Sequence, residues 1–172
     1  MTKLIKKPIF ITITAFVFFL IFSAYSYASS ISSDLSKSVF RLHVIANSDS
    51  DEDQSLKLQV RDKLLDYMNS ITANVSSKDD AIKIAQDHQK DFQIIAEQTI
   101  LDKGYSYPVT VEIGNYEFPT KHYGDITLPS GYYDALRVKI GDACGHNWWC
   151  VMFPPLCFVD VTSGIVPESS KD

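Results

Sequence analysis

Hydrophobic and polar positions divide the chain into an apolar N-terminal segment and a longer region with mixed periodicities. Residues 8–22 carry no charge and consist mostly of Ile, Phe, Val and Leu. Further on, residues 39–46 (VFRLHVIA) are apolar at nearly every position. Such a short run, ended by the polar residues Asn47-Ser48-Asp49, predicts a strand that is buried on both sides.

Two helices are predicted after this strand. Apolar residues recur at the helical spacing in the first one, at Leu56, Val60, Leu64, Met68, Ile71 and Val75. Ser77 with Asp80 resembles a capping box, which predicts the start of a second helix. Gly104 takes the usual place after the end of that helix. A single face is predicted for it, formed by Ala81, Ile84, Ala85, His88, Phe92, Ile95, Ala96 and Ile100.

Three further strands are predicted, at residues 107–113, 131–140 and 148–153. Pro154-Pro155 ends the last one, because proline cannot continue a ladder of backbone hydrogen bonds. The order β-α-α-β-β-β favours an α+β fold with two helices packed on one face of a mostly antiparallel sheet. We expect the first strand, residues 39–46, to be central in that sheet.

The N-terminus has the order of a secretory signal. Three lysines precede the apolar run, and Ser26-Tyr27-Ala28 places small residues where a signal peptidase cuts. We therefore predict a signal peptide at 1–28, followed by a Ser-rich tether at 29–37, one domain at 38–166 and a disordered tail at 167–172. An uncleaved anchor is the alternative, since the apolar stretch approaches the roughly 20 residues that span a bilayer. Either way the remainder lies outside the cytoplasm.

Charge narrows the range of partners. Without residues 1–28 the chain has 13 basic and 21 acidic side chains and a formal charge of −8. Nucleic acid is therefore not an expected partner, because binding it requires Lys and Arg to neutralise phosphates. Electrostatic docking on anionic lipid is disfavoured for the same reason. Membrane contact is expected only through the signal or anchor segment.

The cysteines Cys144, Cys150 and Cys157 should all face an oxidising space after export. Cys150 and Cys157 flank the diproline, which could fold the chain back on itself, so we predict a bridge between them. Two buried free thiols are the alternative, because cysteine is among the most buried residue types. Cys144 lies in a polar turn.

A catalytic cysteine is the principal enzymatic hypothesis. Cys150 could pair with His43 or His146, with Asp134 or Asn47 orienting the imidazole. Against this, an apolar surrounding raises the pKa of a thiol and disfavours the thiolate. We therefore assign no catalytic residue.

No cofactor or metal site is predicted. The acidic string 49–53 lacks the Gly and Glu of a calcium loop, because Gln54 and Val60 hold those positions. The four histidines are too scattered for a zinc site that the sequence would reveal.

Aromatic residues near the end of the last strand are candidates for an interface. Neighbouring residues on a strand face opposite ways, so only one of Trp148 and Trp149 can point into a one-faced core. The other must be covered, either by another element of the domain or by a partner. The predicted partner-binding surface comprises His146, Asn147, Trp148, Trp149, Phe153 and Leu156.

Four motifs give the chain a resemblance to a known family. They are FRLHVIANSDS (40–50), LKLQVRD (56–62), GYYDALRVKIG (131–141) and GHNWWCVMFPPLCFVD (145–160). In this order the chain resembles the stage II sporulation protein R family of endospore-forming bacteria, over nearly all of 39–160.

The resemblance implies a secreted signalling protein of sporulation. Such a protein is made in the forespore and crosses the forespore membrane into the space between forespore and mother cell. There it triggers a membrane-embedded aspartic protease, which processes the precursor of the mother-cell sigma-E factor. The family carries no catalytic assignment that transfers to these residues. The alternative function is an extracytoplasmic cysteine hydrolase that uses Cys150 and His146.

Overall fold

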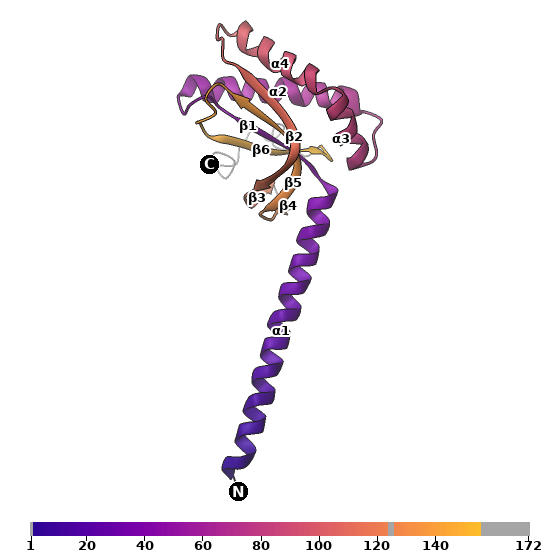
Figure 1. Ribbon diagram of the computed structural model, residues 1–172, viewed down its shortest axis with the longest axis vertical. Helices are drawn as coiled ribbons and strands as arrows, with labels where there is room; N and C mark the ends of the chain where they lie inside the picture. The colour runs from indigo at the N-terminus through magenta and orange to yellow at the C-terminus, as the bar shows by residue number, and fades with distance from the viewer. Residues whose placement is uncertain (1, 124–125, 156–172) are drawn as a thin grey trace. The chain divides into compact units, whose positions relative to one another are not determined.

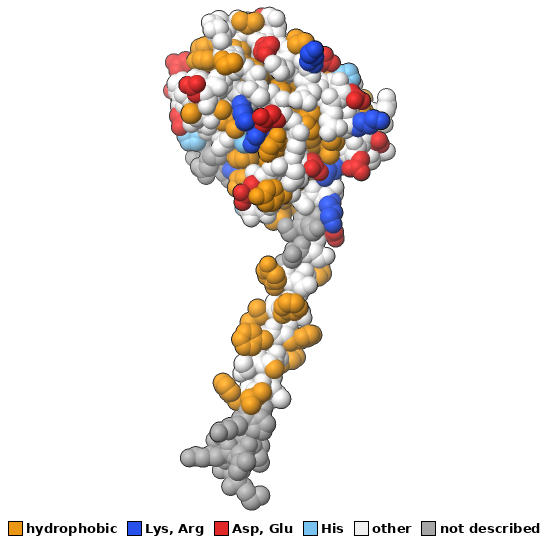
Figure 2. Space-filling view, in the orientation of Figure 1, with side chains coloured by type: hydrophobic (Ala, Val, Ile, Leu, Met, Phe, Trp, Pro, Cys, Tyr) orange, Lys and Arg blue, Asp and Glu red, His pale blue; other side chains and the backbone are white. Residues whose placement is uncertain are grey.

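The N-terminal part of the chain is one long helix. The computed structural model describes residues 2–123 and 126–155, and the chain divides into two compact units, Met1–Leu35 and Ser36–Asp172. Helix α1 (Thr2–Ser38) includes the segment predicted as a tether. Within it, Ile9–Tyr27 has a mean hydropathy of 2.2 and the length and composition to cross a membrane. Its large hydrophobic side chains are exposed (Figure 2), which is compatible with a signal peptide or an anchor.

The described residues of the second unit have the predicted α+β class, with a four-stranded sheet, a two-stranded sheet and three helices. After α1, the elements are β1 (Phe40–Ile45), α2 (Asp51–Thr72), α3 (Lys78–Asp87), α4 (Gln89–Asp102), β2 (Val109–Phe118), β3 (Lys121–Tyr123), β4 (Ile126–Leu128), β5 (Gly131–Ile140) and β6 (Asn147–Phe153). Helices α2, α3 and α4 lie together on one side of the sheet (Figure 1).

Strand β1 is central, as predicted. The sheet order is β2-β5-β1-β6, with β1 parallel to β5 and antiparallel to β6. Strands β2 and β5 are also antiparallel. Phe40, Leu42 and Val44 are fully buried in β1, because strands flank it on both edges and both of its faces are covered.

The predicted helix-end signals at Ser77 and Gly104 are present, and α2 has a cap that was not predicted. Ser50 caps α2 by accepting a hydrogen bond from the Asp53 N–H, and the Ser77 hydroxyl accepts one from the Asp80 N–H at 3.1 Å. Gly104 follows α4 with φ +83°, a left-handed conformation that glycine adopts without strain.

The prediction of one continuous second helix is wrong, because the helix is interrupted at His88. Helix α3 ends at Asp87 and α4 begins at Gln89. The His88 Nδ1 lies 2.8 Å from Tyr67 Oη and 2.7 Å from Asp91 Oδ2, and His88 O accepts from Asp91 N. The apolar spacing continues across this break, so periodicity alone does not reveal it.

The structure also differs from the prediction by a short hairpin of β3 and β4, which the strand pattern did not indicate. It covers the sheet face opposite the helices. The Tyr123 hydroxyl accepts a hydrogen bond from Arg41 Nη2 at 2.6 Å and donates to the Trp149 carbonyl at 3.2 Å. Both sheet faces are therefore covered around β1 and β6.

Candidate functional site

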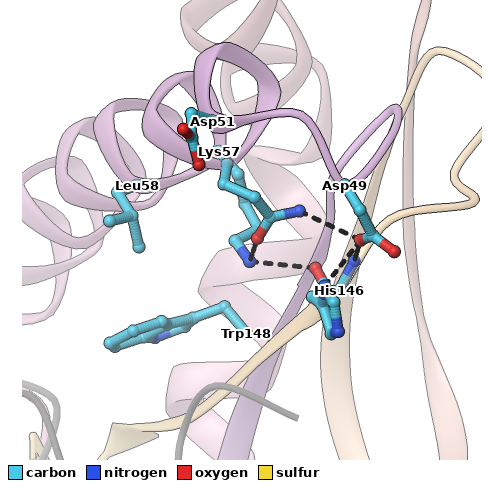
Figure 3. Close-up of a pocket in the computed structure, with 7 residues that line it drawn as sticks. Asp49, Asp51, Lys57, Leu58, His146 and Trp148 are labelled. Atoms are coloured by element: carbon cyan, nitrogen blue, oxygen red, sulfur yellow. Dashed lines mark hydrogen bonds and ion pairs between the residues drawn. The ribbon is translucent and has the colours of Figure 1, made fainter.

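A pocket of about 410 Å³ lies between the beginning of α2 and the beginning of β6. Figure 3 shows that the pocket has a polar end, formed by Asp49 and His146, and an apolar end, formed by Leu58 and Trp148. Its lining comprises Asp49, Asp51, Gln54, Lys57, Leu58, His146 and Trp148. His146 and Trp148 belong to the predicted partner-binding surface, so the structure places part of that surface in a concave site.

Two loops meet closely beside this pocket. The Gly145 N–H donates to the Ala46 carbonyl at 3.0 Å, and the Cys144 N–H donates to the Asn47 carbonyl at 3.2 Å. A Cβ on Gly145 would lie 2.5 Å from the Ser48 carbonyl carbon and closer still to its oxygen. Glycine is therefore required at position 145 for the loops to approach, and this approach places His146 against Asp49.

Asp49 and His146 form the exposed rim of the pocket. Asp49 Oδ1 accepts from the His146 backbone N–H at 2.6 Å and lies 2.6 Å from His146 Nδ1. Both side chains are about half exposed, at 57% and 51%. They remain accessible to a partner although they contact each other.

Asp53, the last residue of the acidic string, points inward. Burial would raise the pKa of its carboxyl, but hydrogen bonds, including those from Ser48 and Asn47, outweigh burial and lower it. Ser48 Oγ donates to Asp53 Oδ2 at 2.6 Å, and Asn47 Nδ2 donates at 2.8 Å. This carboxylate stabilises the loop that carries Asp49.

Lys57 lies deep in the pocket, with only 4% of its surface exposed. Its ammonium donates to Gln54 Oε1 at 2.6 Å and to the His146 carbonyl at 2.9 Å. The pKa of Lys57 is lowered to about 8, mainly by burial and also by the Arg61 charge, while Asp49 opposes this shift. Lys57 thus connects α2 to the loop before β6.

Trp148 forms the apolar wall and is 9% exposed. The Arg61 guanidinium lies over its ring, 4.1 Å from the ring centroid, and Arg61 also pairs with Asp62 at 2.6 Å. The Trp148 indole N–H is buried and has no hydrogen-bond partner among the described residues. A buried donor in this state normally costs free energy.

Asn147 and Trp149 point to the opposite face of the sheet, because side chains alternate along β6. Asn147 Oδ1 lies 2.7 Å from His43 Nε2. The Trp149 ring stacks on His43 at 3.7 Å, with Phe118 edge-on at 4.7 Å. Burial lowers the pKa of His43 to about 4, so its imidazole is neutral at physiological pH.

The structure therefore covers both tryptophans with elements of their own domain, each at 9% exposure. The predicted surface is divided between two faces, and of its described residues only His146 is well exposed. Phe153 is half-buried at the end of β6, while Leu156 lies outside the described residues.

The cysteines differ in their environments. Cys144 is free and exposed, whereas Cys150 is 2% exposed and disulfide-bonded. Cys157 lies outside the described residues. The pairing of Cys150 with Cys157 stays a prediction.

The residues of the hypothetical Cys-His pair are not brought together. Cys150 pairs with Leu42 within the sheet, and His146 precedes β6 by one position, so about four extended residues, or roughly 13 Å, separate them. The candidate orienting groups are engaged elsewhere, with Asp134 paired to Lys78 at 2.6 Å and Asn47 bonded to Asp53. Among residues 2–123 and 126–155, no group of three or more His, Cys, Asp or Glu side chains could hold a metal ion.

Sequence reasoning missed Lys57 and the role of Asp49 in this site. Lys57 lies in the LKLQVRD motif, but helical periodicity assigns its neighbours to the core and leaves a lysine as a surface residue. Asp49 and His146 are 97 positions apart, and nothing local connects them.

Comparisons with known proteins agree with the arrangement of motifs. The family model for stage II sporulation protein R matches residues 36–163. Stage II sporulation protein R of Bacillus subtilis (strain 168) is 36% identical over 132 residues, which cover 77% of this chain and 59% of that relative. The chain thus matches just under three fifths of the length of this curated relative. No solved structure matches.

Proposed function

The chain belongs to the stage II sporulation protein R family, and from this premise we propose that it is an exported signal of sporulation. In this proposal it crosses the forespore membrane into the space between forespore and mother cell. It then binds a membrane-embedded aspartic protease and activates processing of the sigma-E precursor. The apolar N-terminal helix is compatible with export, and the compact α+β unit supplies a surface for the protease.

The observation that carries this proposal is the fixed geometry around His146. Its backbone N–H, ring and carbonyl are held by Asp49 and Lys57, yet about half of the side chain remains exposed. A surface ordered before binding loses less conformational entropy when a partner docks. A protein ligand needs such a surface and requires no nucleophile.

Specific observations disfavour the cysteine hydrolase. Cys150 is disulfide-bonded and buried, and a thiol must instead be free and within hydrogen-bond distance of its base. About four extended residues, or roughly 13 Å, also separate Cys150 from His146. The signalling function is therefore the better supported of the two.

Complementation of a sporulating strain that lacks the native gene tests the proposal. Processing of the sigma-E precursor would be followed by immunoblot, together with the amount of exported protein. We expect His146→Ala to reduce processing at an unchanged protein level. Cys144→Ala is the matched control, because Cys144 is exposed in the same loop, and it should process normally.

Direct contact is tested by placing a photocrosslinking residue at position 146 and, as a control, at Cys144. We expect the protease to be captured more efficiently from position 146. Normal processing by His146→Ala would contradict the proposed surface. A well-folded Cys150→Ala variant with no activity, together with a Cys150 thiol in the native protein that reacts with iodoacetamide, would favour the hydrolase.

A further inference from the structure

We propose that the pocket between α2 and β6 receives a basic residue of the partner, an arginine or lysine displayed on a peptide segment. The proposal rests on the proposed function and names the chemistry that the partner must present. Its basis is the distribution of charge at the mouth, the apolar wall and the unpartnered donor beside that wall.

The exposed charges at the mouth of the pocket are carboxylates, so an incoming group meets negative charge first. The Asp49 side chain is 57% exposed, and Asp51 is exposed in the first turn of α2. The nearby cations are withdrawn, because Lys57 is 4% exposed and the Arg61 side chain is 12% exposed and paired with Asp62. The two carboxylates at the mouth therefore attract a cation and repel a carboxylate, while the half-exposed His146 ring lies beside them, 2.6 Å from Asp49.

The wall suits the aliphatic part of a long basic side chain. Leu58 and Trp148 form the apolar end of the pocket, away from Asp49 (Figure 3). Lysine and arginine place their methylene groups on such surfaces while the charged end stays in a polar region. Arg61 already lies 4.1 Å from the Trp148 ring centroid, which shows that this indole accepts a guanidinium as a neighbour.

The unpartnered Trp148 N–H indicates that the ligand also carries an acceptor. Within residues 2–123 and 126–155 this buried donor has no partner, and Lys57 uses two of its three N–H donors on Gln54 and the His146 carbonyl. A bare cation has no hydrogen-bond acceptor for these donors. A basic residue within a peptide offers its backbone carbonyl to the donors and its side chain to the carboxylates.

Nuclear magnetic resonance of the full chain in non-ionic detergent tests the proposal. The chain has two tryptophans, so two indole N–H signals are expected, and Trp149→Phe assigns them. The probes are N-acetyl-arginine amide, the uncharged isostere N-acetyl-citrulline amide, and N-acetyl-glutamate amide. We expect the arginine probe to shift the Trp148 signal in a saturable way, with affinity several-fold above that of the citrulline probe.

Two carboxamide variants localise the effect. Asp51→Asn should remove most of the preference for arginine over citrulline. Glu52→Gln should keep it, because Glu52 loses the same charge in the same helical turn but does not line this pocket. Equal binding of arginine and citrulline, stronger binding of glutamate, no binding of any probe, or a shift confined to Trp149 would each overturn the proposal.

The result of this binding experiment can contradict the basic occupant without contradicting the proposed signalling function. Probe binding is measured on the isolated protein, whereas signalling is measured by processing of the sigma-E precursor in cells. Normal processing with Asp51→Asn, despite lost arginine binding in the isolated protein, would show that the pocket does not receive the partner. A different result would separate the two proposals the other way. If His146→Ala loses processing but the isolated native protein does not bind the arginine probe, the signalling surface is supported and the basic occupant is refuted.

Discussion

Gly145→Ala tests the contact between the two loops on which the site depends. A Cβ at this position would lie 2.5 Å from the Ser48 carbonyl carbon and 3.0 Å from the Ala46 Cβ. The first obstacle is backbone, which no rotamer change can move. One of the two loops must shift, and the hydrogen bonds from Cys144 to Asn47 and from Gly145 to Ala46 should weaken with it.

The expected loss combines two effects. Overpacking in a well-packed site costs about 1–3 kcal/mol, and each lost backbone hydrogen bond costs about 1 kcal/mol net. Together they lower the free energy of unfolding by about 3–5 kcal/mol, against a total of about 5–15 kcal/mol for an ordinary domain. The variant should fold only partly at the growth temperature or melt on the order of 10 °C lower.

Urea unfolding of the full chain in non-ionic detergent, followed by tryptophan fluorescence, measures this loss. Both tryptophans lie within four residues of Gly145, so the signal reports on the affected region. Gly114→Ala is the matched control, because the nearest contacts of its Cβ would be with the flexible Tyr116 side chain, at 3.1 Å from the hydroxyl oxygen. A change below about 0.5 kcal/mol for Gly145→Ala, the range of ordinary surface substitutions, would refute the close approach of the loops.

Three further predictions concern pH, the cysteines and export. Because burial lowers the pKa of His43 from 6.5 to about 4, the unfolded chain takes up this proton first as pH falls. The free energy of unfolding should therefore decrease between pH 6.5 and 4 by up to about 3 kcal/mol, and His43→Gln should lack this component in urea titrations. Cys150→Ser or Cys157→Ser should destabilise the domain more than Cys144→Ser does, since Cys144 is free and exposed; mass spectrometry that finds Cys144 in the principal disulfide would contradict the pairing. Replacing residues 1–28 with an unrelated signal peptide should preserve processing of the sigma-E precursor, and its loss would assign that segment a role beyond delivery.

Periodicity and capping signals in the sequence predicted most of the fold. Strand β5 has the predicted bounds, the Ser77 cap and the Gly104 end are present, and the apolar run around Leu42 is the central strand. These features depend on residues within one element or one turn. Their physical causes, alternation of side chains and satisfaction of helix ends, are local and can be recognised in sequence.

Other features depend on contacts between distant residues. The break at His88 follows from its contacts with Tyr67 and Asp91, although the apolar face continues through it. The sequence also indicated that the two tryptophans point in opposite directions. Only the structure shows that Arg61 covers one ring and His43 the other.

The candidate site shows the same division. The sequence identified His146 and Trp148 from the unusual composition of one segment. It could not identify Asp49 and Lys57 as their neighbours, because the pocket forms where the loop before α2 meets the loop before β6. That meeting depends on the parallel pairing of β1 with β5, its antiparallel pairing with β6, and the absence of a side chain at Gly145. Local pattern therefore determined the elements, whereas strand pairing and the close packing of two loops determined the site.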